Sequence, residues 1–108
     1  MENQPIPADG MFQFLVPGDL ISTNAAQFRA GANCAIDAQL ANNRGWAGIE
    51  FDLTAAGMVD SAGLNALISM IRRLTGAGKR TLIRVKNPHV YRVCMFTRLD
   101  RLAEVIRS

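Results

Sequence analysis

Hydrophobic and polar positions follow two different periods along the first half of the chain. Residues 11–16, Met-Phe-Gln-Phe-Leu-Val, form a short apolar run that Pro17-Gly18 ends, as is typical of a β-strand. Three capping residues at 22–24, Ser-Thr-Asn, precede a helical pattern that runs to about Asn42. The stripe expected to be buried on this helix is Phe28, Ala32, Ile36 and Leu40. Residues 47–53 then alternate, with Ile49, Phe51 and Leu53 on one side and Glu50 and Asp52 on the other, which predicts a strand with one wet face.

The second half of the chain continues the alternation of strand and helix patterns. Leucines and isoleucines at helical spacing predict a helix that begins at Asp60-Ser61, runs to about Thr75 and is closed by glycines at 76 and 78. Residues 81–86 predict a strand. Asn87-Pro88 then places a capping amide before a proline, which indicates a helix near residues 89–97. Its expected buried side is Val90, Val93 and Cys94, and residues 103–106 can form a last strand.

Strands and helices that alternate in this way define an α/β domain. We expect one domain over residues 11–108, with a sheet of four or five strands, mostly parallel or mixed, packed with helices. Residues 1–10 contain two prolines and end in the turn signal Asp9-Gly10, so we expect an N-terminal leader or an edge strand there. The residues predicted to form the core are Phe28, Ile36, Phe51, Leu67, Ile71 and Val85.

Composition fits a small globular domain, because 49% of the 108 residues are hydrophobic and 19% are charged. No apolar run approaches the roughly 20 residues needed to cross a bilayer, so no membrane insertion is expected. The first residues are polar and lack the layout of a secretory signal, which makes a cytoplasmic location the expectation. Both cysteines, Cys34 and Cys94, fall within apolar helical patterns and are expected to be buried, unreactive thiols.

Charge is distributed unevenly along the chain. Residues 1–71 carry two basic and seven acidic side chains, a net charge of −5, whereas residues 72–108 carry ten basic and two acidic ones, a net charge of +8. Such asymmetry suits either a solvated rim or a surface for nucleic acid or anionic lipid. Only two aromatic residues, Tyr91 and Phe96, stand among these basic residues, too few for the stacking platform of a single-strand binder, so the solvated rim is favoured and no direct contact with nucleic acid is expected.

Motifs for catalysis or cofactor binding are missing from the sequence. Gly76-Ala77-Gly78-Lys79 follows a helix and precedes a strand, which is the reverse of the order in a phosphate-binding loop. A single histidine, His89, supports neither a metal cluster nor a catalytic triad. Glu50 and Asp52 share a strand face, which is a weak signal for acid–base chemistry. We therefore expect no enzyme activity, no catalytic residues, no cofactor and no metal.

The segment around Asp60 and Ser61 allows both a structural and a functional interpretation. Structurally, Asp60 can cap the helix and Ser61 can be its first residue. Functionally, a hydroxyl at this place is exposed at the positive end of the helix dipole, where a phosphate is tolerated. Phosphorylation would change the surface charge by roughly −2 without unfolding the helix.

Five segments in order resemble the STAS-domain family, in particular its anti-sigma-factor antagonists. Asp60-Ser61-Ala62-Gly63-Leu64 is similar to the family's signature, and the likeness extends over about residues 12–106. The other four segments are Val16-Pro17-Gly18-Asp19-Leu20, Ala77-Gly78-Lys79, Asn87-Pro88-His89-Val90-Tyr91-Arg92-Val93 and Arg98-Leu99-Asp100-Arg101-Leu102. Two features depart from the family pattern: Ile21 stands where an acidic residue is common, and no long helix follows the last strand before Ser108.

The resemblance implies a non-catalytic switch. In the family, the unphosphorylated protein binds an anti-sigma factor that is also a serine kinase, and this binding releases the sigma factor. The kinase phosphorylates the serine that corresponds to Ser61, and a serine phosphatase reverses the reaction. The residues implied in partner binding are Asp60, Ser61, Ala62, Gly63 and Asn65. Because the C-terminal helix common in the family is short or absent here, one face or edge of the sheet is less covered, and pairing with a second copy as a homodimer is possible.

A second class of function shares the same signature. STAS subunits of bacterial ABC transporters for phospholipids are small and often carry Asp-Thr/Ser-Ala-Gly-Leu, which is close to residues 60–64. In those subunits the same helix start docks on an ATPase and needs no phosphorylation. A basic C-terminal third would suit such a complex near a membrane.

Overall fold

The computed structural model describes residues 9–42 and 45–108. Most of the expected leader, residues 1–8, lies outside the described residues, while Asp9 and Gly10 form a turn before the first strand. In chain order the elements are β1 (Met11–Leu15), α1 (Ala25–Asn42), β2 (Gly48–Leu53), α2 (Ser61–Gly76), β3 (Arg80–Val85), α3 (Pro88–Phe96), the 3₁₀ turn η1 (Leu99–Arg101) and β4 (Glu104–Arg107). The elements predicted from periodicity are therefore confirmed, with small shifts at their ends.

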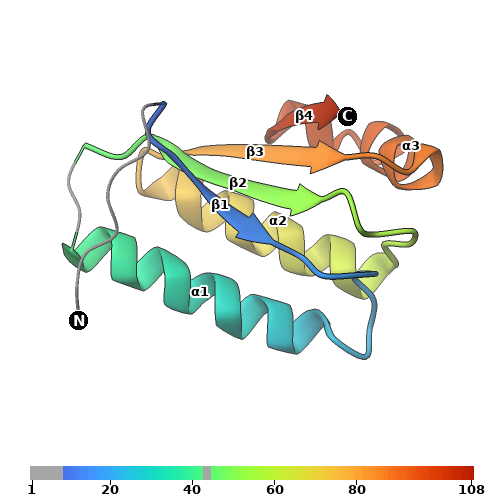
Figure 1. Ribbon diagram of the computed structural model, residues 1–108, viewed down its shortest axis with the longest axis horizontal. Helices are drawn as coiled ribbons and strands as arrows, with labels where there is room; N and C mark the ends of the chain where they lie inside the picture. The colour runs from blue at the N-terminus through green and yellow to red at the C-terminus, as the bar shows by residue number, and fades with distance from the viewer. Residues whose placement is uncertain (1–8, 43–44) are drawn as a thin grey trace.

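Four parallel strands pair in the order β1-β2-β3-β4, so the described sheet is wholly parallel. Helices α1 and α2 lie side by side against one face of the sheet, and α3 lies beside β4 (Figure 1). Arg107 stacks on the ring of Tyr91, which ties the end of β4 to α3. Because every strand runs the same way, all three loops that lead from a strand into a helix gather at one edge of the sheet.

Aromatic rings fill the core between the sheet and α1. Phe14, Phe28 and Phe51 meet pairwise edge to face, with ring centroids 5.8, 5.8 and 5.7 Å apart. This is the geometry that aromatic quadrupoles favour. All six residues predicted to form the core are buried, which confirms the assignment of the inward faces of the sheet and helices.

Two predictions on α1 are wrong, and both fail because of the helix period. Leu40 is 45% exposed, whereas Gln39 is buried. Each step of four residues advances about 40° beyond a full turn, so Leu40 lies about 120° from Phe28 while Gln39 lies only about 20° from it. Cys34 is also exposed, because its position on the wheel points away from the same stripe.

On α3 the prediction holds in part. Val90 and Cys94 are buried, and burial raises the pKa of the Cys94 thiol to about 11, so this thiol stays protonated and unreactive at neutral pH. Val93 is only half-buried, because it lies at the border of the inward face.

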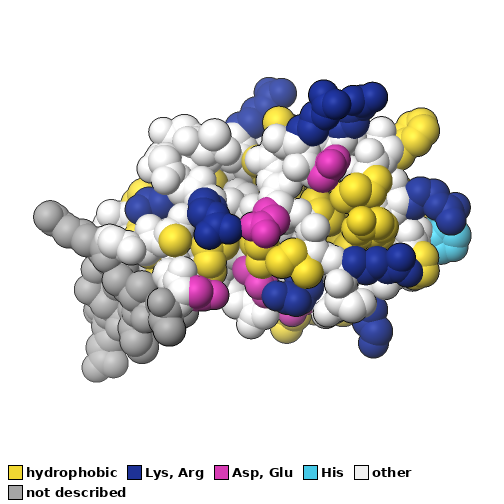
Figure 2. All heavy atoms as spheres, turned by 90° about the horizontal axis from the view of Figure 1, so that it is seen from above, with side chains coloured by type: hydrophobic (Ala, Val, Ile, Leu, Met, Phe, Trp, Pro, Cys, Tyr) yellow, Lys and Arg dark blue, Asp and Glu magenta, His cyan; other side chains and the backbone are white. Residues whose placement is uncertain are grey.

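Charged pairs cross the sheet face opposite the helices, between hydrophobic side chains that also lie on this face. Glu50 on β2 pairs with Arg84 on β3 at 3.1 Å, and Arg80 pairs with Glu104 on β4 at 2.8 Å. Asp52 accepts hydrogen bonds from the backbone N–H and the hydroxyl of Thr54, which lower the pKa of its carboxyl group. Figure 2 looks onto this face and shows Asp and Glu side chains near its middle. Glu50 and Asp52 are thus both engaged in bonds within the fold.

Truncation of Ile71 to Ala should lower the free energy of unfolding by about 2–5 kcal/mol, because Ile71 is 1% exposed and its removal opens a cavity between α2 and the sheet. The matched control is Leu40→Ala, which removes an exposed side chain and should cost under about 1 kcal/mol. Urea denaturation of both variants measures the difference. Equal losses would mean that the buried stripe of α2 has been assigned to the wrong face.

Candidate functional site

Ser61 is exposed at the first position of α2, as the sequence predicts. Asp60 is the N-cap: its backbone is extended, and its Oδ1 accepts a hydrogen bond from the N–H of Gly63 at 2.9 Å. The carbonyl of Asp60 accepts from the N–H of Leu64 at 2.8 Å, which completes the first helical turn. This arrangement presents the Ser61 hydroxyl to solvent at the positive end of a 16-residue helix.

Asp60 has a second task, which sequence reasoning missed. Its Oδ2 accepts a hydrogen bond from the N–H of Ser22, 2.8 Å away in the loop between β1 and α1. The N–H of Gly63 and then the N–H of Ser22 are the main causes that hold the pKa of the Asp60 carboxyl group below its usual value. Asp60 therefore stays ionised at neutral pH and joins two loops.

The same two loops are bonded along their length. Leu20 donates to the carbonyl of Met58 at 3.0 Å, and its own carbonyl accepts from the N–H of Asp60 at 3.2 Å. Asp19 Oδ1 accepts from the N–H groups of Gly57 at 2.7 Å and Met58 at 3.1 Å. These bonds fix the loop that leads into Ser61, so the start of α2 has one defined position relative to β1.

Gly63 is buried, and its role is steric. A Cβ atom at this position would overlap the carbonyl oxygen of Leu20 and lie 2.8 Å from its carbonyl carbon. Only glycine lets the helix approach the loop this closely. The glycine of the Asp60-Ser61-Ala62-Gly63-Leu64 segment is thus required by the close approach of the backbone.

Other exposed groups surround Ser61. Asn65 follows one turn later on α2 and is exposed, while Ala62 is half-buried. Met58, two residues before the N-cap, is an apolar side chain that is 57% exposed. A groove of about 360 Å³ lies beside it, lined by Gly57, Met58, Val59, His89, Val90 and Val93. Sequence reasoning did not assign Met58 to the site, because one exposed apolar residue leaves no periodic signal.

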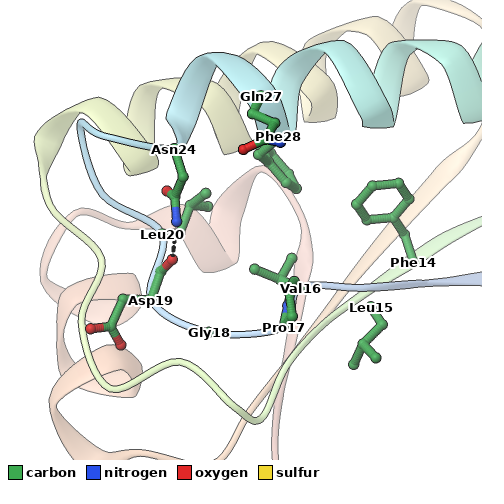
Figure 3. Close-up of a pocket in the computed structure, with 10 residues that line it drawn as sticks. All are labelled: Phe14, Leu15, Val16, Pro17, Gly18, Asp19, Leu20, Asn24, Gln27 and Phe28. Atoms are coloured by element: carbon green, nitrogen blue, oxygen red, sulfur yellow. Dashed lines mark hydrogen bonds between the residues drawn. The ribbon is translucent and has the colours of Figure 1, made fainter.

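An apolar pocket of about 280 Å³ lies on the other side of the same loops, between the end of β1 and the start of α1 (Figure 3). Phe14, Val16 and Phe28 line it, and Asn24 donates to the carbonyl of Asp19 at 2.7 Å. The one ionisable residue in its lining, Asp19, turns its carboxylate away from the apolar side chains and toward the loop before α2. The pocket thus offers packing and no reactive group.

The described residues hold no group of three His, Cys, Asp or Glu side chains placed to bind a metal ion. Within residues 9–42 and 45–108, every helix is too short or too polar to cross a bilayer.

Together, the parallel four-stranded sheet and the capped helix that presents Ser61 define the fold of the STAS domain, as found in anti-sigma factor antagonists. An assigned anti-sigma factor antagonist of Thermotoga maritima superposes with a TM-score of 0.75 at 22% identity, over 94% of this chain and 82% of that one. The anti-sigma factor antagonist SpoIIAA in its unphosphorylated form gives a TM-score of 0.64 at 19% identity, over 96% and 84%. A sulfate transporter family protein of Wolinella succinogenes gives 0.71 at 15% identity, over 95% and 80%.

At these identities the likeness establishes the fold. No protein-family model matches the sequence, and no curated protein matches it. The expected STAS fold is therefore confirmed by structure.

Substitution of Gly63 by Ala should destabilise the protein by about 1–3 kcal/mol or more, because the backbone of Leu20 cannot move away without breaking its bonds to Met58 and Asp60. Gly76→Ala is the matched control: it lies in the same helix, has open space around it and should change stability by less than about 1 kcal/mol. Denaturant unfolding compares the two. Equal stability of both variants would show that the contact with Leu20 does not constrain α2.

The stability difference between wild type and Asp60→Asn should depend on pH. Because the folded pKa of Asp60 is lowered, its ionised form stabilises the native state above the usual carboxyl pKa of about 3.9, and this contribution is lost as the pH falls through the folded value. We expect wild type to be more stable at neutral pH and the two proteins to converge in acid. Thermal unfolding across the acid range measures this, and a constant difference would contradict it.

Proposed function

We propose that the protein is an anti-sigma-factor antagonist that is switched off by phosphorylation of Ser61. In its unphosphorylated form it binds an anti-sigma factor that is also a serine kinase, and thereby releases the sigma factor. A serine phosphatase restores the active form. The observation that supports this function best is the exposed Ser61 hydroxyl, which stands at a helix start that Asp60 and Leu20 hold in place. The proposal needs no catalytic residue in this chain, and it places the protein in the cytoplasm.

A phosphate on Ser61 suits the local structure. Among the described residues, the Ser61 hydroxyl makes no hydrogen bond, so its modification breaks none. The dipole of α2 and the free N–H groups of its first turn favour an anion at this end. The modified protein should keep its fold, and the signal is a change of surface charge.

The same phosphate opposes binding of a partner on this surface. A partner that covers the start of α2 must remove water from Ser61, and Asp60 already places one negative charge beside it. A phosphate adds about −2 at neutral pH. Unless the partner provides a cation, burial of this group costs several kcal/mol, and each 1.4 kcal/mol lowers the affinity tenfold.

In this proposal the partner contacts Asp60, Ser61, Ala62 and Asn65, and Met58 adds an apolar anchor at the border. Gly63, which was also expected to bind the partner, contributes by setting the position of the helix rather than by exposed surface. A homodimer stays a prediction, because the described chain is a single copy.

A second candidate is a STAS subunit of a phospholipid ABC transporter, which would dock on its ATPase through the same helix start. The likeness to a sulfate transporter family protein supports this candidate, because it shows the fold in a transport protein. The two candidates differ in whether Ser61 is phosphorylated.

Ser61→Ala should fold normally and bind the kinase without being released, whereas Ser61→Asp should fold normally and bind more weakly. Asp carries less charge and fewer acceptor oxygens than phosphoserine, so its effect should be partial. Calorimetric titration against the kinase measures affinity, circular dichroism confirms folding, and mass spectrometry locates the phosphate. Ser22→Ala is the control, because Ser22 is exposed and bonded to the same Asp60, yet should leave phosphorylation unchanged. Equal affinity of wild type and Ser61→Asp, with no phosphate on Ser61, would favour the transporter subunit.

A further inference from the structure

The outer face of α3 combines exposed basic side chains with an exposed aromatic ring. His89, Arg92 and Phe96 are spaced three and then four residues apart along the same outward stripe, opposite the buried Val90 and Cys94. Phe96 is 87% exposed, the highest value among the exposed large hydrophobic residues. Single exposed apolar residues are common on proteins, but a nearly bare Phe flanked by arginines is not explained by packing.

Charge on this part of the surface is positive and unpaired. Residues 86–103 contain four basic side chains, Lys86, Arg92, Arg98 and Arg101, against one acidic residue, Asp100. No ion pair joins any of these four to an acidic side chain among the described residues, whereas Arg73, Arg80 and Arg84 are all paired. In Figure 2 the Lys and Arg side chains line the rim on the right, which is the side of α3.

Arg98 occupies a backbone position that favours glycine. Its φ is +58°, which makes it the one described residue other than glycine with a positive φ, and it ends α3 in the left-handed conformation. Glycine is the usual residue at such a helix end, because it has no Cβ to strain. An exposed arginine kept at this position despite the strain points to a use for its side chain.

We propose that the outer face of α3, with the turn that follows it, binds the surface of an anionic lipid bilayer. Phe96 enters the headgroup layer, while Arg92, Arg98 and Arg101 contact lipid phosphates. Aromatic rings among basic side chains are the composition of helices that lie in the membrane interface, and each such cation adds to the attraction toward anionic lipid. An acidic protein partner is less favoured than a bilayer. Phe96 protrudes from the helix surface, so a protein partner would need a cavity that matches its ring, whereas the headgroup layer can rearrange around it.

This surface is separate from the helix start that presents Ser61. The end of α3 near His89 borders the groove beside Met58, and Phe96 lies about 10 Å further along the helix. The two proposals rest on different residues, and the vesicle assay and the kinase assay test them separately.

Vesicle sedimentation with the full chain tests the proposal. We expect binding to vesicles of equal parts phosphatidylglycerol and phosphatidylcholine, none to phosphatidylcholine alone, and a steep loss as salt rises above about 0.15 M. Arg92→Gln and Arg101→Gln should each weaken binding about fivefold, the equivalent of about 1 kcal/mol. Phe96→Trp should bind as wild type does and shift its fluorescence to the blue on anionic vesicles, because the new indole enters the headgroup layer while Trp46 stays buried.

Arg98→Gly separates binding from folding. The variant should melt at a higher temperature than wild type, because glycine relieves the left-handed backbone, and yet bind anionic vesicles about fivefold more weakly. Arg29→Gln, which removes an exposed arginine on α1, is the matched control and should leave binding unchanged.

Three results would overturn the proposal. The first is equal binding to both kinds of vesicle, or binding to neither. The second is equal weakening by Arg29→Gln and Arg98→Gly, which would mean that only net charge matters. The third is tighter binding to a polyglutamate peptide or to duplex DNA than to vesicles, with no effect of Phe96→Ala, which would assign the surface to an acidic polymer.

Discussion

The contact between the backbone of Leu20 and the start of α2 determines where this domain presents Ser61 and the proposed binding surface around it. The carbonyl of Leu20 accepts from the N–H of Asp60 and lies against the bare Cα of Gly63, while its side chain is 1% exposed in the core. Two loops that are 38 residues apart in sequence thus become one surface, with Asp19 and Asp60 each bonded from one loop to the other. This contact fixes the position of Ser61.

A surface held this firmly favours a switch that works by charge alone. Many phosphorylation switches order or melt a segment, which requires a segment close to its own folding equilibrium. Here the loop before Ser61 is bonded at Gly57, Met58, Val59 and Asp60, so it has little freedom for a phosphate to change. A partner would then distinguish two proteins of the same shape that differ in the electrostatic potential at one helix start.

Periodicity in the sequence was sufficient for the elements and for most of the core, because burial follows the repeat of a helix or strand directly. The errors on α1 arise where a four-residue spacing drifts away from the true helix period, so Leu40 was assigned to a face that Gln39 occupies. The hydrogen bonds that join the two loops of the site could not be predicted from the sequence, for a different reason. Asp19 to Gly57 and Ser22 to Asp60 join residues with no local pattern in common, and only the fold brings them together. The signature glycine was recognised by resemblance, and its physical cause needed the position of Leu20.

The fold shows which of the unevenly distributed charged side chains form hydrogen bonds or ion pairs and which do not. Several acidic residues in the first two thirds are engaged in the fold: Asp19, Asp52 and Asp60 accept backbone N–H groups, and Glu50 neutralises Arg84. In the last third, the arginines of β3 are paired, whereas those of α3 and its following turn form no ion pair with any of the described residues. Positive charge without an ion pair among the described residues is thus concentrated on α3 and its following turn, although Arg29 on α1 and Arg72 on α2 are also exposed. The carboxylates of Asp19 and Asp60 join the two loops at the start of α2. In the proposed switch, a phosphate on Ser61 would add negative charge beside the ionised Asp60 and would remove none of the positive charge on α3 and its following turn.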